Sequence, residues 1–370
     1  MPSDAVVVGA GIVGAACADA LTAEGVSVTV LESRFPGGGS TAAAMGHVVV
    51  MDDSDAQFAL TRLSRELWEG LAPELPPDCE DERAGTLWIA ADESEMSAVR
   101  RKGASYRGRG VAVEELGPEE LAREEPNLRP GLAGALRVPG DRIVYPPAAA
   151  RFFLERARAR GARVVAGAAA SVIGPRRVTT PRGVFDGAVV VNAAGIAAPL
   201  LTPGLPVAPR KGHLVITDRY PGFCRHQLVE LGYLASAHGP SPESVAFNLQ
   251  PRATGQMLLG SSREFVGLDA AVNRRIRGRM IRRALEFMPA LGRLSALRTW
   301  TGFRPATPDN LPLVGAWPET EGLYVAAGHE GLGVTTALGT ARLIADAIVG
   351  KASAIDPAPY LPTRGFAAHA

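Results

Sequence analysis

The sequence has few cysteines, few aromatic residues and no long apolar run. Its three cysteines are far apart and form no C-x-x-C pair, which argues against a disulfide framework and against a metal or iron–sulfur site. The apolar stretch 184–201 is interrupted by Asp186 and Asn192, so no segment is typical of a membrane span. We therefore expect a reduced, cytoplasmic protein without a transmembrane segment.

An excess of charge of either sign is also missing. Lysine and arginine total 39 and aspartate and glutamate 38, for a net charge of +1, which gives no reason to expect nucleic acid as a partner. The start, MPSDAVVVGAG, has no basic segment of a signal peptide. The six histidines are isolated in the sequence, and no catalytic triad or carboxylate pair is apparent. A chain of 370 residues is expected to form two domains.

The N-terminus carries a dinucleotide-binding pattern. A short apolar strand (residues 5–8) leads into G-A-G-I-V-G (residues 9–14), an apolar helical pattern and a second strand that closes on Glu32. The three glycines suit a tight turn, a pyrophosphate close to the backbone and a helix packed on the sheet. Glu32 would accept hydrogen bonds from both ribose hydroxyls. A glycine-rich turn without ligand is the alternative, but it leaves Glu32 unexplained. The predicted contacts here are Gly9, Gly11, Ile12, Val13, Gly14, Glu32, Ser33 and Arg34.

The segment after Glu32 favours FAD over NAD. Residues 33–47 are mostly small or hydroxylated, so the backbone can pass close to a large flat ligand, and hydroxyl groups can reach phosphate oxygens. A flexible linker is the alternative. The predicted contacts in this loop are Ser40, Thr41, Ala44, Gly46 and His47.

These motifs resemble the D-amino acid oxidase family of flavoproteins, especially the branch of glycine oxidase, sarcosine oxidase and D-hydroxyproline dehydrogenase. The resemblance covers nearly the whole chain. Besides the two N-terminal segments it includes V-V-V-N-A-A-G (residues 189–195), T-G-F-R-P-A-T-P-D (residues 301–309) and A-G-H-E-G-L-G-V-T-T (residues 327–336). It implies further cofactor contacts at Ala170, Ala194, Gly195, Gly331, Leu332, Gly333, Val334 and Thr335.

The last of these motifs lies between a predicted strand (323–327) and a predicted helix (334–349). In the family this helix N-terminus points at the flavin, where its dipole stabilises negative charge on the reduced ring. A plain helix N-terminus with glycines for packing is the alternative. The family's covalent cysteine and histidine positions fall near Gly302 and Ala43, so we expect FAD to be bound non-covalently.

Arg304 is the candidate for binding substrate. It lies in a small, apolar setting, and its planar fork of donors matches a carboxylate; in the family the arginine at this place does so. A structural pair with Asp309 is the alternative. A family tyrosine falls near Asn248, so Tyr233 could supply the second contact. His47 and Glu330 are expected near the ring, although His47 could simply be structural.

The fold class implied is α/β, with a Rossmann-like FAD-binding domain and an α+β substrate domain built on a mainly antiparallel sheet. We predict a discontinuous FAD-binding domain (1–82, 146–206 and 305–370) and a substrate-binding domain (83–145 and 207–304). The basic helix predicted at 274–287 is most simply a solvated face and less simply a docking surface.

The predicted reaction is dehydrogenation of a D-amino or imino acid, with cis-4-hydroxy-D-proline as first choice and D-proline as another substrate. Hydride transfer from Cα to flavin N5 needs orientation and no obligatory acid–base side chain. The electron acceptor would be oxygen, a quinone or a partner subunit. Two alternatives stay open: a glycine- or sarcosine-type oxidase releasing hydrogen peroxide, and the flavin subunit of an opine-oxidising or cyanide-forming complex.

Overall fold

The computed structural model describes residues 3–232 and 243–366. The chain forms two compact units: residues 1–79, 145–210 and 303–370 make unit 1, and residues 80–144 and 211–302 make unit 2. The predicted assignment of FAD binding to the first unit and substrate binding to the second stays a proposal. Within the described residues, no helix has the length and apolar character needed to cross a membrane.

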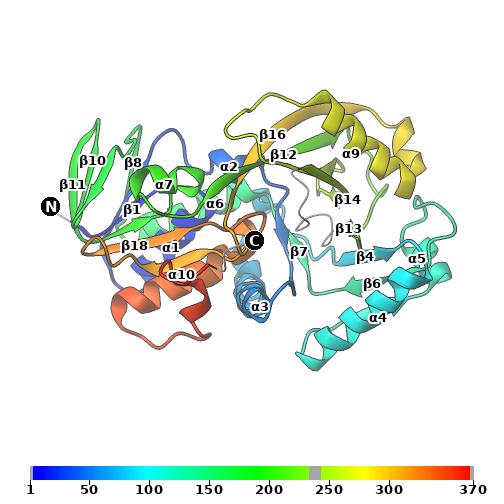
Figure 1. The fold of residues 1–370 in the computed structure, drawn as a ribbon, viewed down its shortest axis with the longest axis horizontal. Helices are drawn as coiled ribbons and strands as arrows, with labels where there is room; N and C mark the ends of the chain where they lie inside the picture. Colours follow the sequence, from blue (N-terminus) through cyan, green and yellow to red (C-terminus); the bar gives the residue numbers. More distant parts are fainter. Residues whose placement is uncertain (1–2, 233–242, 367–370) are drawn as a thin grey trace. The chain divides into compact units, whose positions relative to one another are not determined.

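Unit 1 is built on a mostly parallel sheet (Figure 1). Its helices and strands are β1 (Ser3–Val8), α1 (Ile12–Ala23), β2 (Val28–Glu32), α2 (Gly39–Ala43), β3 (His47–Val48), α3 (Asp55–Leu71), η1 (Ala72–Glu74), η2 (Pro77–Cys79), α6 (Pro146–Ala159), β8 (Arg163–Ala166), β9 (Val172–Gly174), β10 (Arg177–Thr180), β11 (Gly183–Asn192), η3 (Gly195–Ala197), α7 (Ala198–Leu201), β17 (Leu313–Ala316), β18 (Leu323–Ala327), α10 (Gly333–Val349) and η5 (Ala358–Tyr360).

The strand order in this sheet is β17-β18-β11-β1-β2-β8. Strands β18, β11, β1, β2 and β8 are parallel, whereas β17 runs antiparallel to β18. Strands β9 and β10 form an antiparallel extension of β11. Helix α1 contacts α6 and α10 closely because small buried residues such as Ala15 and Ala18 line it. The sheet core contains Val6, Val190 and Val325, all fully buried.

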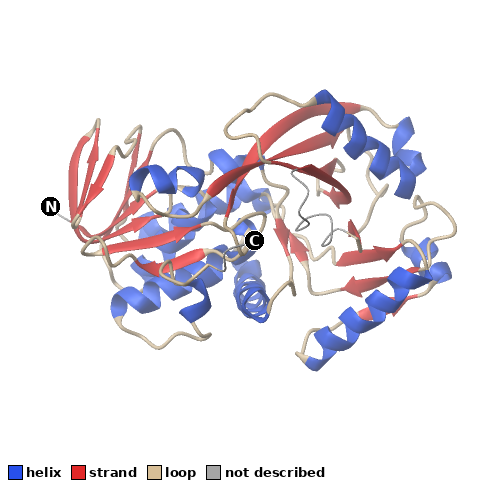
Figure 2. Cartoon of the chain, in the orientation of Figure 1, coloured by secondary structure: helices blue, strands red, loops and turns tan. Residues whose placement is uncertain are grey.

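Unit 2 is built on a mainly antiparallel sheet covered by helix α9 (Figure 2). Its elements are β4 (Thr86–Ala90), α4 (Glu93–Gly108), β5 (Glu114–Leu116), α5 (Pro118–Glu124), β6 (Gly134–Val138), β7 (Arg142–Ile143), β13 (Gln227–Glu230), β14 (Glu243–Pro251), β15 (Met257–Glu264), α9 (Arg274–Phe287) and η4 (Pro289–Arg293), while β12 (Ala208–Thr217) and β16 (Ala296–Ala306) each cross the division between the units.

The strand order in this sheet is β16-β12-β15-β14-β13-β4-β6-β5, and β13 and β4 are its parallel neighbours. Helix α9 buries Ile276, Met280 and Phe287, and the ring of Phe287 stacks on Phe247 of β14. Three of its arginines, Arg275, Arg279 and Arg283, form ion pairs, as Arg275 does with Glu243. The solvated face predicted for 274–287 is therefore present, and the predicted α/β fold class is confirmed.

One sequence-based element is wrong. The apolar and small residues at 162–173 predict one strand, but β8 ends at Ala166 and β9 begins at Val172. Gly167 adopts a positive φ of 66°, and the N–H of Ala168 donates to the carbonyl of Glu32 at 2.8 Å. The chain therefore turns at the end of β8, which carries residues 167–170 towards Glu32.

Candidate functional site

Five loops meet at one edge of the sheet in unit 1. They follow the carboxyl ends of β1, β2, β8, β11 and β18. Strand β1 lies between β2 and β11, and the connection through α1 leads only to β2. The gap between β1 and β11 is therefore a topological switch point, where open α/β sheets bind their ligands.

The turn after β1 is packed as a phosphate-binding turn requires. Gly9 has a φ of 104°, and a Cβ there would lie 2.5 Å from the carbonyl oxygen of Ala193. A Cβ on Gly14 would lie 2.0 Å from the carbonyl oxygen of Gly9. The first turn of α1 has no acidic residue, and its N-cap residue, a glycine, provides no side-chain cap. Apart from the N–H of Ile12, which donates to the Thr41 hydroxyl, its N–H groups and dipole can serve an anion.

Glu32 is held beside this turn at the end of β2. Its Oε2 accepts from the backbone N–H of Ala10 at 2.8 Å and its Oε1 from that of Arg34 at 2.8 Å; the Ser33 hydroxyl donates to Oε1 at 3.1 Å. A carboxylate offers about four lone-pair positions, so acceptor capacity for a ribose diol is left. The predicted role of Glu32 fits its position.

The loop of small and hydroxylated residues at 33–47, called the small-residue loop below, is hydrogen-bonded to two other segments of the site. The Thr41 hydroxyl accepts from the N–H of Ile12 at 3.0 Å and keeps its own proton for a phosphate oxygen. The Ser40 hydroxyl donates to the carbonyl of Phe303 at 2.5 Å. In this arrangement Ser40 has no second proton to give, so its predicted phosphate contact would require that bond to break.

Asn192 shapes the turn after β11. Its Nδ2 donates to the Ala198 carbonyl at 3.0 Å and to Thr202 at 2.9 Å, and its Oδ1 accepts from the N–H of Ala194 at 3.2 Å. Since Asn192 is fully buried, these bonds position Ala194 and Gly195 against the fingerprint turn. Both residues were predicted to contact the cofactor.

The loop after β18 leads into α10 and is tied to the small-residue loop. The Thr335 hydroxyl donates to the carbonyl of His47 at 2.8 Å, and the indole N–H of Trp68 donates to the carbonyl of Val334 at 3.2 Å. The first turn of α10 carries no acidic residue, so its dipole can stabilise negative charge. Trp68 was missed, because helical periodicity predicts its burial but not its hydrogen-bond partner.

The two histidines of these loops differ. His329 donates to or accepts from the Thr340 hydroxyl at 3.0 Å, and burial lowers its pKa to about 4. His47 has an enclosed ring whose Nε2 has no hydrogen-bond partner within the described parts of the chain, and burial lowers its pKa to about 3. His329 is therefore structural, whereas His47 presents an unsatisfied nitrogen beside the predicted flavin loop.

Arg304 lies against the loop after β18. The backbone N–H of Glu330 donates to the carbonyl of Pro305 at 2.9 Å, and a Cβ on Gly331 would lie 3.4 Å from Nε of Arg304. The expected alternative partner is wrong: Asp309 makes a two-fold ion pair with Arg364, at 2.7 and 2.9 Å. The carboxylate near Arg304 is that of Glu330, 3.9 Å from its Nε.

Arg210 is a second arginine at Glu330 that the sequence did not single out. Its Nη1 lies 3.6 Å from Oε1 of Glu330, and its side chain is 7% exposed. Arg210 belongs to the segment 207–218, which alternates as a strand does, and nothing in that pattern indicates a partner at position 330.

Asn248 lies in unit 2, on the sheet face opposite α9. Its neighbours Phe247 and Leu249 belong to the core beneath α9, so Asn248 points the other way. Its paired residues on β13 and β15 are Val229 and Gly260. The Oδ1 of Asn248 is buried and has no partner within the described residues. Tyr233, the other predicted substrate contact, lies outside the described residues.

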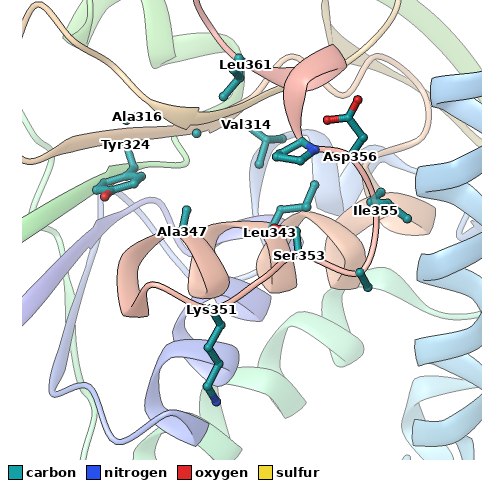
Figure 3. Close-up of a pocket in the computed structure, with 13 residues that line it drawn as sticks. Val314, Ala316, Tyr324, Leu343, Ala347, Lys351, Ser353, Ile355, Asp356 and Leu361 are labelled. Carbon is teal, nitrogen blue, oxygen red and sulfur yellow. The ribbon is translucent and has the colours of Figure 1, made fainter.

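A hollow of about 650 Å³ lies elsewhere in unit 1, under the C-terminal segment (Figure 3). Its lining includes Tyr324, near the start of β18, and Leu343 and Ala347, towards the end of α10. The predicted cofactor loop instead joins the other ends of these two elements. This hollow is therefore not the cofactor site.

The residues at the carboxyl edge fit FAD. Two helix N-termini without acidic residues face the region of the loops, a carboxylate stands at the end of β2, and a buried nitrogen of His47 lacks a partner within the described residues. Phosphates suit the first helix, a ribose suits Glu32 and a flavin ring suits the loops around His47 and Thr335. Each of these residue assignments stays a proposal.

Curated relatives cover most of the chain. Hydrogen cyanide synthase subunit HcnC of Pseudomonas aeruginosa is 28% identical, over 98% of this chain and 96% of the relative. A D-amino acid dehydrogenase of Xylella fastidiosa is 31% identical, over 78% of this chain and 66% of the relative.

Solved structures show the same fold. Glycine oxidase from Geobacillus kaustophilus has a TM-score of 0.89 and 28% identity, and the match covers 99% of this chain and 100% of that one. L-proline dehydrogenase from P. horikoshii has a TM-score of 0.88 and 26% identity, with 98% and 97% covered. The family model described as DAO, FAD dependent oxidoreductase, matches residues 4–347. The chain belongs to this family of FAD-dependent oxidoreductases.

Proposed function

We propose that the protein oxidises a D-amino or imino acid, with cis-4-hydroxy-D-proline as the preferred substrate and D-proline as a second one. The observation that carries this proposal is Arg304, which lies against Gly331 of the predicted flavin loop. Its side chain is 20% exposed, so the guanidinium is accessible to a substrate carboxylate. The similarity to an L-proline dehydrogenase supports a cyclic amine as substrate.

Buried polar residues on the sheet face of unit 2 opposite α9 support a hydroxylated substrate. Thr86 is paired with Gln227, and Trp88 lies in the row that includes Asn248. The side-chain atoms Thr86 Oγ1, Trp88 Nε1, Gln227 Oε1 and Asn248 Oδ1 are buried without a partner within the described residues. Leaving such atoms unsatisfied costs about 1–3 kcal/mol each, and a ring hydroxyl or an amine could satisfy one of them.

For this reaction the protein mainly has to orient the substrate relative to the flavin. When bound, FAD supplies a hydride acceptor at N5. Arg304 holds the substrate carboxylate and so directs Cα. The N-terminus of α10 favours negative charge nearby. The burial that keeps the pKa of His47 at about 3 leaves this ring neutral at ordinary pH, so it can offer a hydrogen bond but no fixed charge.

Mixing the purified holoenzyme with a panel of amino acids without oxygen tests the substrate. We expect cis-4-hydroxy-D-proline to bleach the flavin absorbance fastest, followed by D-proline, with the L-enantiomers slower by at least about 100-fold. Cyclopentanecarboxylate, which lacks the amine, is the control and should leave the flavin oxidised. A flavin that neither D-amino acid bleaches would overturn the substrate proposal.

Two other functions are distinguished by the electron acceptor. The similarity to glycine oxidase favours an oxidase, which would release hydrogen peroxide steadily in air with glycine or sarcosine. The similarity to a hydrogen cyanide synthase subunit favours a role inside a complex, in which case turnover would appear only with partner chains. For the proposed dehydrogenase, a quinone or dye acceptor should restore turnover without peroxide.

The three cysteines are buried and form no disulfide, which suits a protein of the cytoplasm.

A further inference from the structure

Glu330 lies between two arginines and is itself firmly held. Its backbone N–H donates to Pro305 at 2.9 Å, and its Oε2 accepts from the N–H of Gly331. It adopts a φ of 46°, a conformation that non-glycine residues take only when their surroundings impose it. Its side chain is 6% exposed. The carboxylate therefore stays within reach of both guanidinium groups.

The two arginines share this carboxylate almost equally. Oε1 of Glu330 lies 3.6 Å from Nη1 of Arg210 and 3.9 Å from Nε of Arg304. They differ in exposure, because the side chain of Arg304 is 20% exposed and that of Arg210 is 7% exposed. An incoming carboxylate can therefore reach Arg304 more easily than Arg210, and it must compete with Glu330 for that guanidinium.

We propose that Arg210 is a positioning residue that holds Glu330 and so leaves Arg304 available for the substrate carboxylate. This inference rests on the proposed role of Arg304. Without Arg210, the buried charge of Glu330 would lose one of its two guanidinium neighbours and would draw more on Arg304, and an external carboxylate would bind more weakly. Without the charge of Glu330, Arg210 would no longer be needed for this purpose.

A double-mutant cycle tests the inference. The probe is cyclopentanecarboxylate, titrated into the oxidised holoenzyme and followed by the flavin absorbance change, which gives a Kd without turnover. We expect Arg210→Met to raise this Kd about tenfold, Glu330→Gln to lower it severalfold, and the double variant to bind as well as the wild type or better. KM for D-proline should follow the same order while kcat changes little.

Control variants separate positioning from folding. Arg364→Met removes another arginine from a carboxylate pair in unit 1, with a side chain 10% exposed, and should leave the Kd unchanged. Arg210→Lys keeps the charge and should stay within about threefold of the wild type. If Arg210→Met does not fold, Glu330→Gln and Arg210→Lys still test the proposal. Cyclopentanecarboxamide, the neutral twin of the probe, should bind equally to every variant.

The outcomes also separate this inference from the proposed function. Arg304→Lys should raise the Kd of the carboxylate at least tenfold while flavin stays bound; an unchanged Kd would contradict the role of Arg304 itself. If Arg304→Lys weakens binding but Arg210→Met does not, or if Glu330→Gln fails to rescue Arg210→Met, the positioning role is wrong and the role of Arg304 stands.

Discussion

At the scale of single residues, burial sets the charge of His329 and gives stability a pH dependence. The folded chain keeps this ring neutral until the pH falls to about 4, whereas an unfolded chain protonates it near pH 6.5. Between these values the unfolded state binds more protons, so the free energy of unfolding falls as the pH is lowered. The stabilisation linked to the neutral His329 ring is fully present above pH 6.5 and amounts to about 3 kcal/mol of the free energy of unfolding.

The variant His329→Gln tests whether His329 causes this pH dependence of stability, because glutamine can still form a hydrogen bond with the Thr340 hydroxyl but does not titrate. The free energy of unfolding of the FAD-saturated protein, measured in urea, should fall between pH 7 and pH 5 in both proteins. The fall should be about 2 kcal/mol smaller for the variant than for the wild type. His47, whose pKa is also lowered, remains in both proteins and serves as an internal reference. Equal losses in the two proteins would show that His329 is already accessible to protons when folded.

Local sequence patterns do not predict which residues form ion pairs in the site, and the predicted roles of the site residues stay predictions. Arg304 is predicted to bind the substrate carboxylate because an arginine in a small apolar segment is unusual. The alternative, a structural pair with Asp309, is wrong, since Asp309 pairs with Arg364. Glu330 is predicted near the flavin ring, and no local pattern indicates that Arg210 lies beside it. Ion pairs across more than a hundred residues follow from strand order and loop geometry, which local patterns do not contain.

At the scale of elements, the packing of α1 on the loop between β11 and η3 depends on glycine. A Cβ at Gly14 would lie 2.0 Å from the carbonyl oxygen of Gly9 and 3.3 Å from Cβ of Ala193. Gly14→Ala should therefore push α1 away from the sheet, cost about 2 kcal/mol or more and abolish retention of FAD. Thermal unfolding and flavin content after gel filtration measure both effects.

Gly70→Ala is the matched control on another helix of unit 1. Gly70 lies near the end of α3, and a Cβ there meets nothing within 4 Å. The same substitution should stabilise the protein by about 0.5 kcal/mol and leave FAD bound. If Gly14→Ala behaved like Gly70→Ala, the close approach of α1 to the fingerprint turn would not be needed for the cofactor.

Elements with one strong local pattern were predicted well. The basic helix was expected at 274–287 and α9 spans Arg274–Phe287, and the C-terminal helix begins one residue earlier than expected. The strand expected at 162–173 was wrong because apolar and small residues continue through the turn at Gly167. An alanine-rich run carries no signal for where a strand ends, since the turn depends on the positive φ of Gly167 and on the hydrogen bond that the N–H of Ala168 donates to the carbonyl of Glu32.

At the scale of the whole molecule, one cofactor must be held by segments far apart in sequence. Loops after β1, β2, β8, β11 and β18 share one edge of the unit 1 sheet. The sequence motifs predicted this grouping, because glycine-rich strand–helix junctions place their loops at the carboxyl ends of parallel strands. The strand order and the antiparallel extension at β9 and β10 were not predictable, since they depend on contacts between distant strands.

Removing FAD should therefore loosen these loops together. Hydrogen exchange of the FAD-free protein, before and after FAD is added back, should show slower exchange at residues 9–14, 39–47, 193–195 and 328–335, because ligand binding suppresses local opening. Exchange in the interior of α9 (Arg274–Phe287), a helix of unit 2, should change far less and serves as the control. If FAD instead protected residues 351–361, which line the hollow in Figure 3, or slowed only one of the four segments, the carboxyl edge could not be the cofactor site. Protection of all four segments would place a single ligand across the loops that follow β1, β2, β11 and β18.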